Sequence, residues 1–163
     1  MTIGAIRSAI ALGFFLSGCI SMGQGEHSNH GVSNGVLLPC PASPNCVSSQ
    51  NTEHFVEPLA YAETPEEARQ DLITVLNRMK RVTIVEENAG YLRAEFRSAL
   101  FRFVDDVEFY FNDSAKSIEV RSASRVGYSD FGVNRRRVEA IRKAWLAREQ
   151  TRAAHQDRER SSR

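Results

Sequence analysis

The residues best suited to chemistry are arginines that concentrate between Arg121 and Arg137. This stretch holds five arginines and a single acid, Asp130. Guanidinium groups are planar donors that bind phosphate or carboxylate, and a helix N-terminus adds backbone N–H groups that favour anions. We therefore expect this region to bind a small anionic or amphipathic ligand. The candidate ligand-binding residues are Arg97, Arg102, Arg121, Arg125, Tyr128, Ser129, Asn134, Arg135 and Arg137.

Three consecutive arginines, Arg135 to Arg137, occupy the predicted first turn of a helix whose N-cap we assign to Asn134. Positive charge at this end of a helix is unfavourable, so an anion should offset it. In a helical projection Arg136 points away from the apolar stripe, whereas Arg135 and Arg137 flank it. The preceding loop, "GYSDFG", could close over a ligand.

The offsetting anions can also come from the protein itself. The predicted strand "FVDDVEF" carries several carboxylates that could pair with the arginines across the sheet. The candidate acidic partners are Asp105, Asp106, Glu108 and Asp130. Two interpretations therefore stay open: a ligand-binding module, or a structural or interaction protein with an internal salt-bridge network.

Motifs typical of catalysis are weak in this chain. Asp105 and Asp106 are adjacent on a predicted strand, so their side chains point to opposite faces and cannot form a dyad. His54 has no nucleophile placed beside it in a known motif, and neither a Gly-rich phosphate loop nor a zinc motif is present. We expect a protein that is not an enzyme, with no cofactor and no metal site.

Two predicted helices and a set of strands must position these residues. "TPEEARQDLITVLNRMK" has a capping box and an apolar stripe at helical spacing, and the region after Asn134 repeats that spacing with Val138, Ile141 and Trp145. Between them, strand-like segments alternate apolar and polar residues. The order β-α-β-β-β-β-α predicts an α+β fold, a two-layer sandwich in which two helices cover one face of an antiparallel sheet.

The N-terminus resembles an export signal rather than part of the fold. Arg7 is followed by a short apolar run, which is too short to span a bilayer, and "LSGC" resembles the bacterial lipobox with Cys19 as the lipidated residue. Ile20 follows Cys19, and in the lipoprotein pattern this residue implies the outer membrane. We expect a lipid-anchored protein on the periplasmic face of that membrane, with the inner membrane as the alternative.

The chain is expected to divide into four parts. These are a signal peptide over residues 1–18, a flexible tether over 19–38, a folded domain over 39–148, and a charged tail over 149–163 that is a candidate for disorder. The formal net charge of the whole chain is +1, which argues against a nucleic-acid partner. The expected partners are the membrane, through the lipid, and a small anionic or lipid-like ligand or an envelope protein.

Two further cysteines, Cys40 and Cys46, lie in the turn-rich stretch "CPASPNC". In an exported protein such a pair predicts a disulfide, and two thiols without nearby histidines make a poor zinc site. Free or redox-active thiols remain the alternative.

Three stretches resemble one known family. "CPASPNCVSSQ", "YLRAEFRSALFRFVDDVEFYF" and "IEVRSASRVGYSDFGVNRRRVEAIR" are similar to the DUF1499 family, and the resemblance extends from about Pro39 to Leu146. It implies a small domain that is often exported or membrane-associated. It implies no catalytic residues, because the function of this family is uncharacterised.

Overall fold

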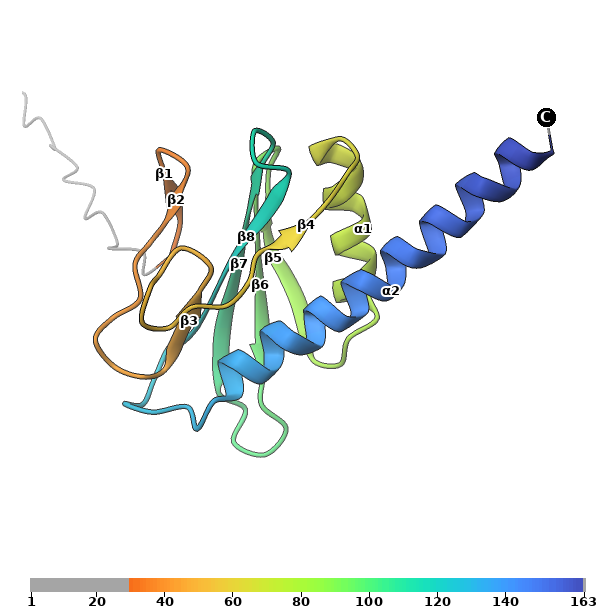
Figure 1. Ribbon diagram of the computed structural model, residues 1–163. Coiled ribbons are helices and arrows are strands. Elements are labelled where there is room, and N and C mark those ends of the chain that lie inside the picture. Colours follow the sequence, from red (N-terminus) through yellow and green to blue (C-terminus); the bar gives the residue numbers. More distant parts are fainter. Residues whose placement is uncertain (1–29, 163) are drawn as a thin grey trace, which may run out of the picture.

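The computed structural model describes residues 30–162, which fold around one antiparallel sheet. Its six strands are β3 (Cys46–Ser48), β4 (Leu59–Ala60), β5 (Val82–Glu87), β6 (Tyr91–Arg97), β7 (Val104–Asn112) and β8 (Ser117–Ser124). The strand order is β3-β8-β7-β6-β5, and β4 also pairs with β8. Two helices, α1 (Pro65–Asn77) and the first part of α2 (Val133–Ser161), lie against one face of this sheet, and the rest of α2 extends beyond it (Figure 1). The predicted α+β sandwich is thus confirmed.

The core forms between the sheet and the two helices. Alternate strand residues such as Phe109, Val120 and Leu92 face the helices and are buried. From α2, Trp145 enters the same core, and its Nε1 donates a hydrogen bond to the carbonyl oxygen of Ala60 at 2.9 Å. The periodicity of the sequence predicted these inward residues because burial on one face requires strict alternation.

Helix α1 begins as its sequence predicts. Thr64 is the N-cap, and its hydroxyl accepts a hydrogen bond from the backbone of Glu67, whose carboxylate accepts from the backbone of Thr64. Pro65 occupies the first turn, where a missing N–H has no cost. Helix α2 differs from the prediction at its far end, because it continues through the predicted tail to Ser161.

The opposite face of the sheet is also covered, which the sequence did not predict. A two-stranded hairpin, β1 (Val32–Ser33) and β2 (Val36–Leu37), lies on that side (Figure 1), followed by a loop that leads into β3. The predicted tether over residues 19–38 is therefore wrong for the residues of this hairpin. The rest of that tether, residues 19–29, and the predicted signal peptide lie outside the described residues.

Strand β3 is a second difference, because the stretch from Cys46 was not predicted as a strand. It is three residues long and pairs with the end of β8, so Cys46 lies opposite Ala123. The segment over residues 53–61, which precedes α1, contributes β4 and a bridge from Phe55 to Ser48. Within residues 30–162, none of the helices has the length and apolar content needed to cross a bilayer.

Candidate functional site

The polar face of the sheet is built around Glu108, which is fully buried on the central strand β7. One carboxylate oxygen accepts hydrogen bonds from the Tyr91 hydroxyl at 2.9 Å and from the backbone of Gly31 at 2.6 Å. The other oxygen pairs with Arg121, whose side chain is 5% exposed. Burial and the neighbouring Glu108 carboxylate raise the pKa of Tyr91, so this phenol remains protonated. The segment that leads into the hairpin therefore covers a buried ion pair in which both oxygens of Glu108 are bonded.

Asp106 forms a second charge cluster one step along the same face. It accepts hydrogen bonds from Arg93 at 2.9 Å and from Arg125 at 2.7 and 2.8 Å, and Arg125 also reaches Glu95 at 2.6 Å. Burial by itself would raise the pKa of Asp106, but the two guanidinium groups lower it overall. The same contacts raise the pKa of Arg125. Asp106 and Arg125 are therefore both charged at neutral pH.

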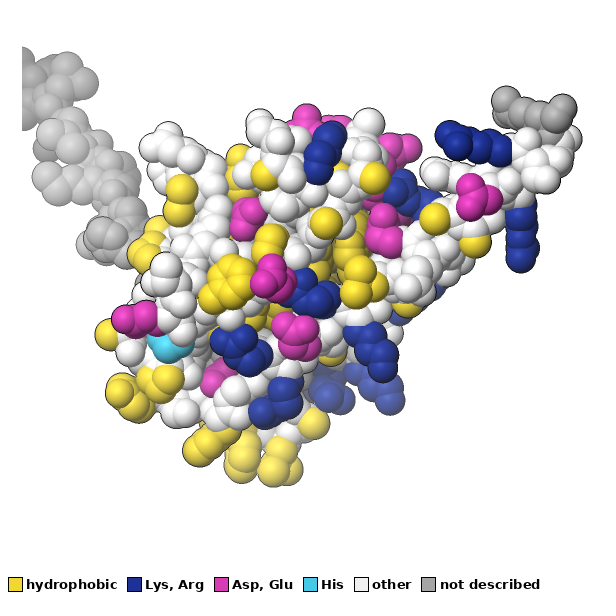
Figure 2. Space-filling view, viewed as in Figure 1, with side chains coloured by type: hydrophobic (Ala, Val, Ile, Leu, Met, Phe, Trp, Pro, Cys, Tyr) yellow, Lys and Arg dark blue, Asp and Glu magenta, His cyan; other side chains and the backbone are white. Residues whose placement is uncertain are grey.

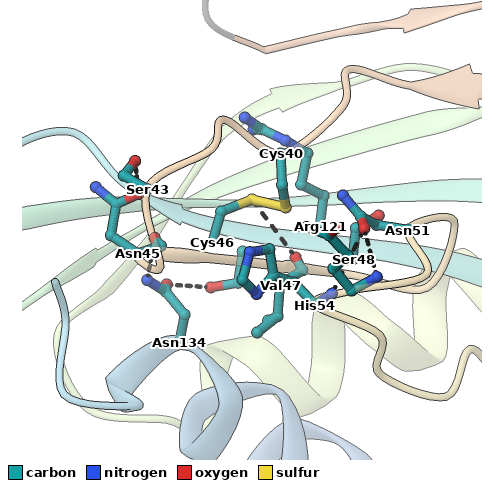
Figure 3. The surroundings of a disulfide bond; sticks show 12 residues. Cys40, Ser43, Asn45, Cys46, Val47, Ser48, Asn51, His54, Arg121 and Asn134 are labelled. Atoms are coloured by element: carbon teal, nitrogen blue, oxygen red, sulfur yellow. Dashed lines mark hydrogen bonds between the residues drawn. A yellow bond between two sulfur atoms is a disulfide. The ribbon is translucent and has the colours of Figure 1, made fainter. Parts of the chain in front are cut away.

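A disulfide between Cys40 and Cys46 closes the loop that covers this face, with 5.6 Å between the Cα atoms. This confirms the predicted pairing. Figure 3 shows that the Arg121 side chain extends alongside Cys40, and that Asn45 and Asn134 meet below the loop. The Asn134 amide donates to the Asn45 carbonyl oxygen at 2.9 Å, and the Asn45 amide donates to the Gly127 carbonyl oxygen at 2.6 Å. These bonds fix the disulfide loop to the start of α2.

A pocket of about 500 Å³ lies between this loop and the polar face. One side is apolar and comes from the covering segment, while the other side is polar and comes from β7, β8 and the residue after β8. The lining residues are Leu38, Pro39, Cys40, Pro41, Asn45, Asp106, Arg121, Ala123, Ser124 and Arg125. Among the described residues, the buried Nε of Arg121 has no hydrogen-bond partner. A buried donor without an acceptor is costly, so Arg121, which also lines the pocket, gains from a further acceptor.

Asn134 and Arg137 lie on the other side of the sheet, in a separate buried cluster. The guanidinium of Arg137 pairs with Asp105, donates to the Ser122 hydroxyl at 3.1 Å and stands 5.1 Å from the centre of the Phe96 ring. Asp105 therefore faces the helices while Asp106 faces the pocket, as alternation requires. The prediction that these two carboxylates cannot act as a dyad is confirmed.

The N-terminus of α2 is capped differently from the prediction. Gly132 is the N-cap, with φ at 75°, and Asn134 is inside the helix and fully buried. Instead, Asp130 accepts hydrogen bonds from the backbones of Gly132 at 2.9 Å and Asn134 at 2.7 Å. Our assignment of Asn134 as N-cap is wrong because its side chain is bonded within the interior, to Ser122 and Asn45. The carboxylate of Asp130 already supplies the anion that this helix end favours.

The remaining candidates lie outside the pocket. Tyr128, Arg135 and Arg102 are exposed, and Arg135 donates a hydrogen bond to the carbonyl oxygen of Phe55. Arg136 is exposed as predicted, but so is Arg135, and only Arg137 of the three is nearly buried. The structure therefore separates the predicted set into a pocket group (Arg121, Arg125), an interior group (Asn134, Arg137) and a surface group, which contains Arg97, Arg102, Tyr128, Ser129 and Arg135.

Sequence reasoning missed the apolar side of the pocket and two of its polar supports. Leu38 and Pro39 stand next to Cys40, so their proximity to a predicted disulfide was the available signal. Tyr91 and Arg93 alternate with inward residues on β6, which placed them on the polar face, but nothing in the sequence indicated that this face is covered.

Comparisons with known proteins agree with this domain. No curated protein matches the chain significantly. A family described as "Protein of unknown function (DUF1499)" matches residues 36–145, which is more than half of the chain and includes the disulfide loop, the whole sheet from β3 onward and the first part of α2. The chain therefore belongs to the DUF1499 family.

Proposed function

We propose that this protein is a lipid-anchored component of the cell envelope whose domain binds a small ligand in the pocket beneath the Cys40–Cys46 loop. The ligand combines an acceptor oxygen with an apolar portion. The observation that carries the proposal is the position of Arg121, which lines the pocket and whose buried Nε has no hydrogen-bond partner among the described residues.

The walls of the pocket support this class of ligand. Leu38, Pro39 and Pro41 offer an apolar surface, and Arg121 and Arg125 offer guanidinium groups opposite it. Ligand sites in proteins are typically apolar concavities with a few placed polar groups. Asp106 and Glu108 already neutralise the two arginines. The pocket therefore provides hydrogen bonds in a nearly neutral site, which suits a ligand of low net charge.

The position of the pocket supports an origin of the ligand in the envelope. Its apolar wall belongs to the segment that follows the predicted lipidation site, Cys19. A lipid anchor at Cys19 holds this wall near a bilayer, where amphipathic molecules are concentrated. Changing Cys19→Ser should leave the precursor unprocessed or release the protein from membranes, as measured by fractionation and intact mass. Unchanged processing and fractionation would contradict the lipid anchor.

Native mass spectrometry of the protein purified from its own envelope tests the ligand. We expect a mass above that of the lipidated chain, and denaturation should release a small molecule. A spectrum that contains only the bare lipidated chain, from preparations without detergent exchange, would contradict ligand binding.

A second candidate function is that of a structural or interaction protein of the envelope. It is favoured by the ion pairs Arg121–Glu108, Arg125–Asp106 and Arg137–Asp105, which satisfy three of the predicted ligand-binding arginines within the fold. In this case the arginines act on stability, and the pocket remains empty in the purified protein.

A further inference from the structure

Two loops at one end of the sheet expose large apolar side chains. The loop between β6 and β7 and the loop between β8 and α2 are neighbours because Arg97 pairs with Val104 and Asp105 pairs with Ser124. We call their exposed apolar residues the loop patch: Leu100, Phe101, Phe103, Val126, Tyr128 and Phe131. Figure 2 shows apolar side chains gathered at the end of the molecule where Figure 1 places these two loops.

The exposure of the loop patch exceeds that of scattered surface residues. Phe131 is 87% exposed, Leu100 80%, Tyr128 77% and Phe101 69%. Burying a Phe or Leu side chain is worth about 1.5–3 kcal/mol, and contiguous apolar surface typically marks an interaction site. None of these side chains contributes to the core of the described domain. Burial of the loop patch against a partner would therefore be favourable.

The loops hold these side chains in defined positions. The rings of Phe101 and Phe103 stack with centroids 5.6 Å apart, and the Phe103 backbone donates to the Ser98 hydroxyl at 2.9 Å. Phe131 has a φ of 52°, an uncommon value for a residue with a side chain. Its carbonyl oxygen accepts a hydrogen bond from Arg136 at 2.8 Å. The aromatic groups are thus presented by bonded turns.

Positive charge surrounds the loop patch. Arg102, Arg135 and Arg136 are exposed, and within residues 30–162 they pair with no carboxylate. The acids at this end are engaged elsewhere, since Glu95 pairs with Arg125 and Asp130 caps α2. Aromatic side chains flanked by arginines are suited to the boundary between lipid headgroups and acyl chains. The guanidinium groups match phosphate oxygens, and the rings match the apolar region below them.

We propose that the loop patch docks on a bilayer surface that contains anionic lipids. Phe101 and Phe131 enter the interface, and Arg102, Arg135 and Arg136 contact headgroup phosphates. This contact is separate from the lipid on Cys19 and from the ligand pocket, so its test and theirs can fail independently. It fixes which end of the domain faces the membrane.

The length of chain before the described domain allows this orientation. Gly31 is bonded to Glu108, halfway along β7, about four residues or 13 Å from the strand end that carries the loop patch. From Cys19 to Gly31 the chain can extend to about 40 Å. A lipid at Cys19 and the loop patch can therefore contact the same bilayer.

Single tryptophan substitutions measure this contact in the full chain. We would purify the protein from its membranes, reconstitute it in vesicles that contain brominated phosphatidylcholine and phosphatidylglycerol, and compare Phe101→Trp and Phe131→Trp with Leu146→Trp. Leu146 is also exposed, but it lies about 20 Å along α2 from its start. The native Trp145 is buried and supplies a constant background.

We expect blue-shifted, strongly quenched emission from the two loop probes and unquenched emission from the probe at position 146. Replacing phosphatidylglycerol by phosphatidylcholine should weaken the docking, and Arg102→Gln should weaken it about fivefold, the effect of about one cation at an anionic surface. The matched change Arg158→Gln, at the far end of α2, should have no effect. Loop probes that remain unquenched in both lipid mixtures would overturn the proposal and assign the loop patch to a protein partner.

Discussion

At the scale of single residues, the pocket depends on charged groups that are removed from water but remain paired. Glu108 accepts three hydrogen bonds, one of them from Arg121, whose Nε is a buried donor without a partner among the described residues. Buried charged groups are concentrated at functional sites, but structural ion-pair networks contain them as well. The two possibilities differ in what substitution of the arginines does to stability.

Arg137 and Asp105 form the buried pair that best represents a structural role. Each single change, Arg137→Ala or Asp105→Ala, should lower the free energy of unfolding by about 3 kcal/mol, because it leaves a buried charge without its partner. The double variant should lose less than the sum, with a coupling of about 1–3 kcal/mol. Urea unfolding measures all four proteins, and Arg136→Ala is the exposed control. Additive losses would contradict a direct ion pair.

Asp106 predicts how stability depends on pH. Its folded pKa lies below the ordinary value of 3.8, so the ionised carboxylate stabilises the fold at neutral pH, and this contribution is lost as the pH falls below about 4. Asp106→Asn should therefore lower the free energy of unfolding at pH 7 by more than at pH 3. Urea unfolding at the two pH values provides the comparison. An equal loss at both pH values would show that the carboxylate charge does not stabilise the fold.

At the scale of elements, the segment over residues 30–46 converts an open sheet face into a covered one. The alternation in β6, β7 and β8 predicted both faces correctly, since one set of residues is apolar apart from Asp105 and the serines at the end of β8. It did not reveal that Arg121 and Glu119 are buried. Residues 30–46 carry no apolar period, and their strands are two residues long, so only contacts distant in sequence, such as Gly31 with Glu108, hold them on the sheet.

The disulfide should stabilise this covering segment. Closing the short loop between Cys40 and Cys46 restricts the unfolded chain, and its reduction should lower the free energy of unfolding by about 2 kcal/mol. Urea unfolding of oxidised and reduced protein measures the difference, and the double variant Cys40→Ser, Cys46→Ser should reproduce it. Identical midpoints would contradict a stabilising bridge.

Glu149 affects the contact between α1 and α2. Burial and the nearby Glu63 carboxylate raise its pKa above the ordinary value of 4.5. The folded state is therefore more stable when this carboxyl is protonated, and that stability is lost as the pH rises through the folded pKa. Glu149→Gln should raise the melting temperature at pH 7 and have little effect near pH 4. The exposed Glu139→Gln is the matched control. A lower melting temperature at pH 7 would show that the ionised group stabilises the helix contact through Arg152.

At the scale of the whole molecule, the ligand pocket and the loop patch are separate features of the same domain. The sequence predicted the sandwich and both helices because the spacing of apolar residues indicates which side of each element is buried. It predicted the disulfide because two cysteines lie close together in a turn-rich stretch. It placed the candidate ligand at the start of α2, because the arginine run suggested an anion there. The structure places Asp130 at that position and locates the pocket on the opposite side of the sheet. Folding distributes the arginines over both faces of the sheet and the surface, and a linear charge count cannot resolve that distribution.

Ligand retention in two variants, each with a leucine in place of an alanine, tests the account most directly. Ala123 lines the pocket, so Ala123→Leu fills it with three further carbon atoms, whereas Ala115 is exposed in the turn between β7 and β8 and Ala115→Leu serves as the control. We would purify both variants and the wild type from the envelope, confirm matching melting temperatures without ligand, and compare native masses. The account predicts a bound small molecule on the wild type and on the Ala115→Leu variant and a bare chain for Ala123→Leu. Equal retention by all three proteins, or none by any, would contradict it.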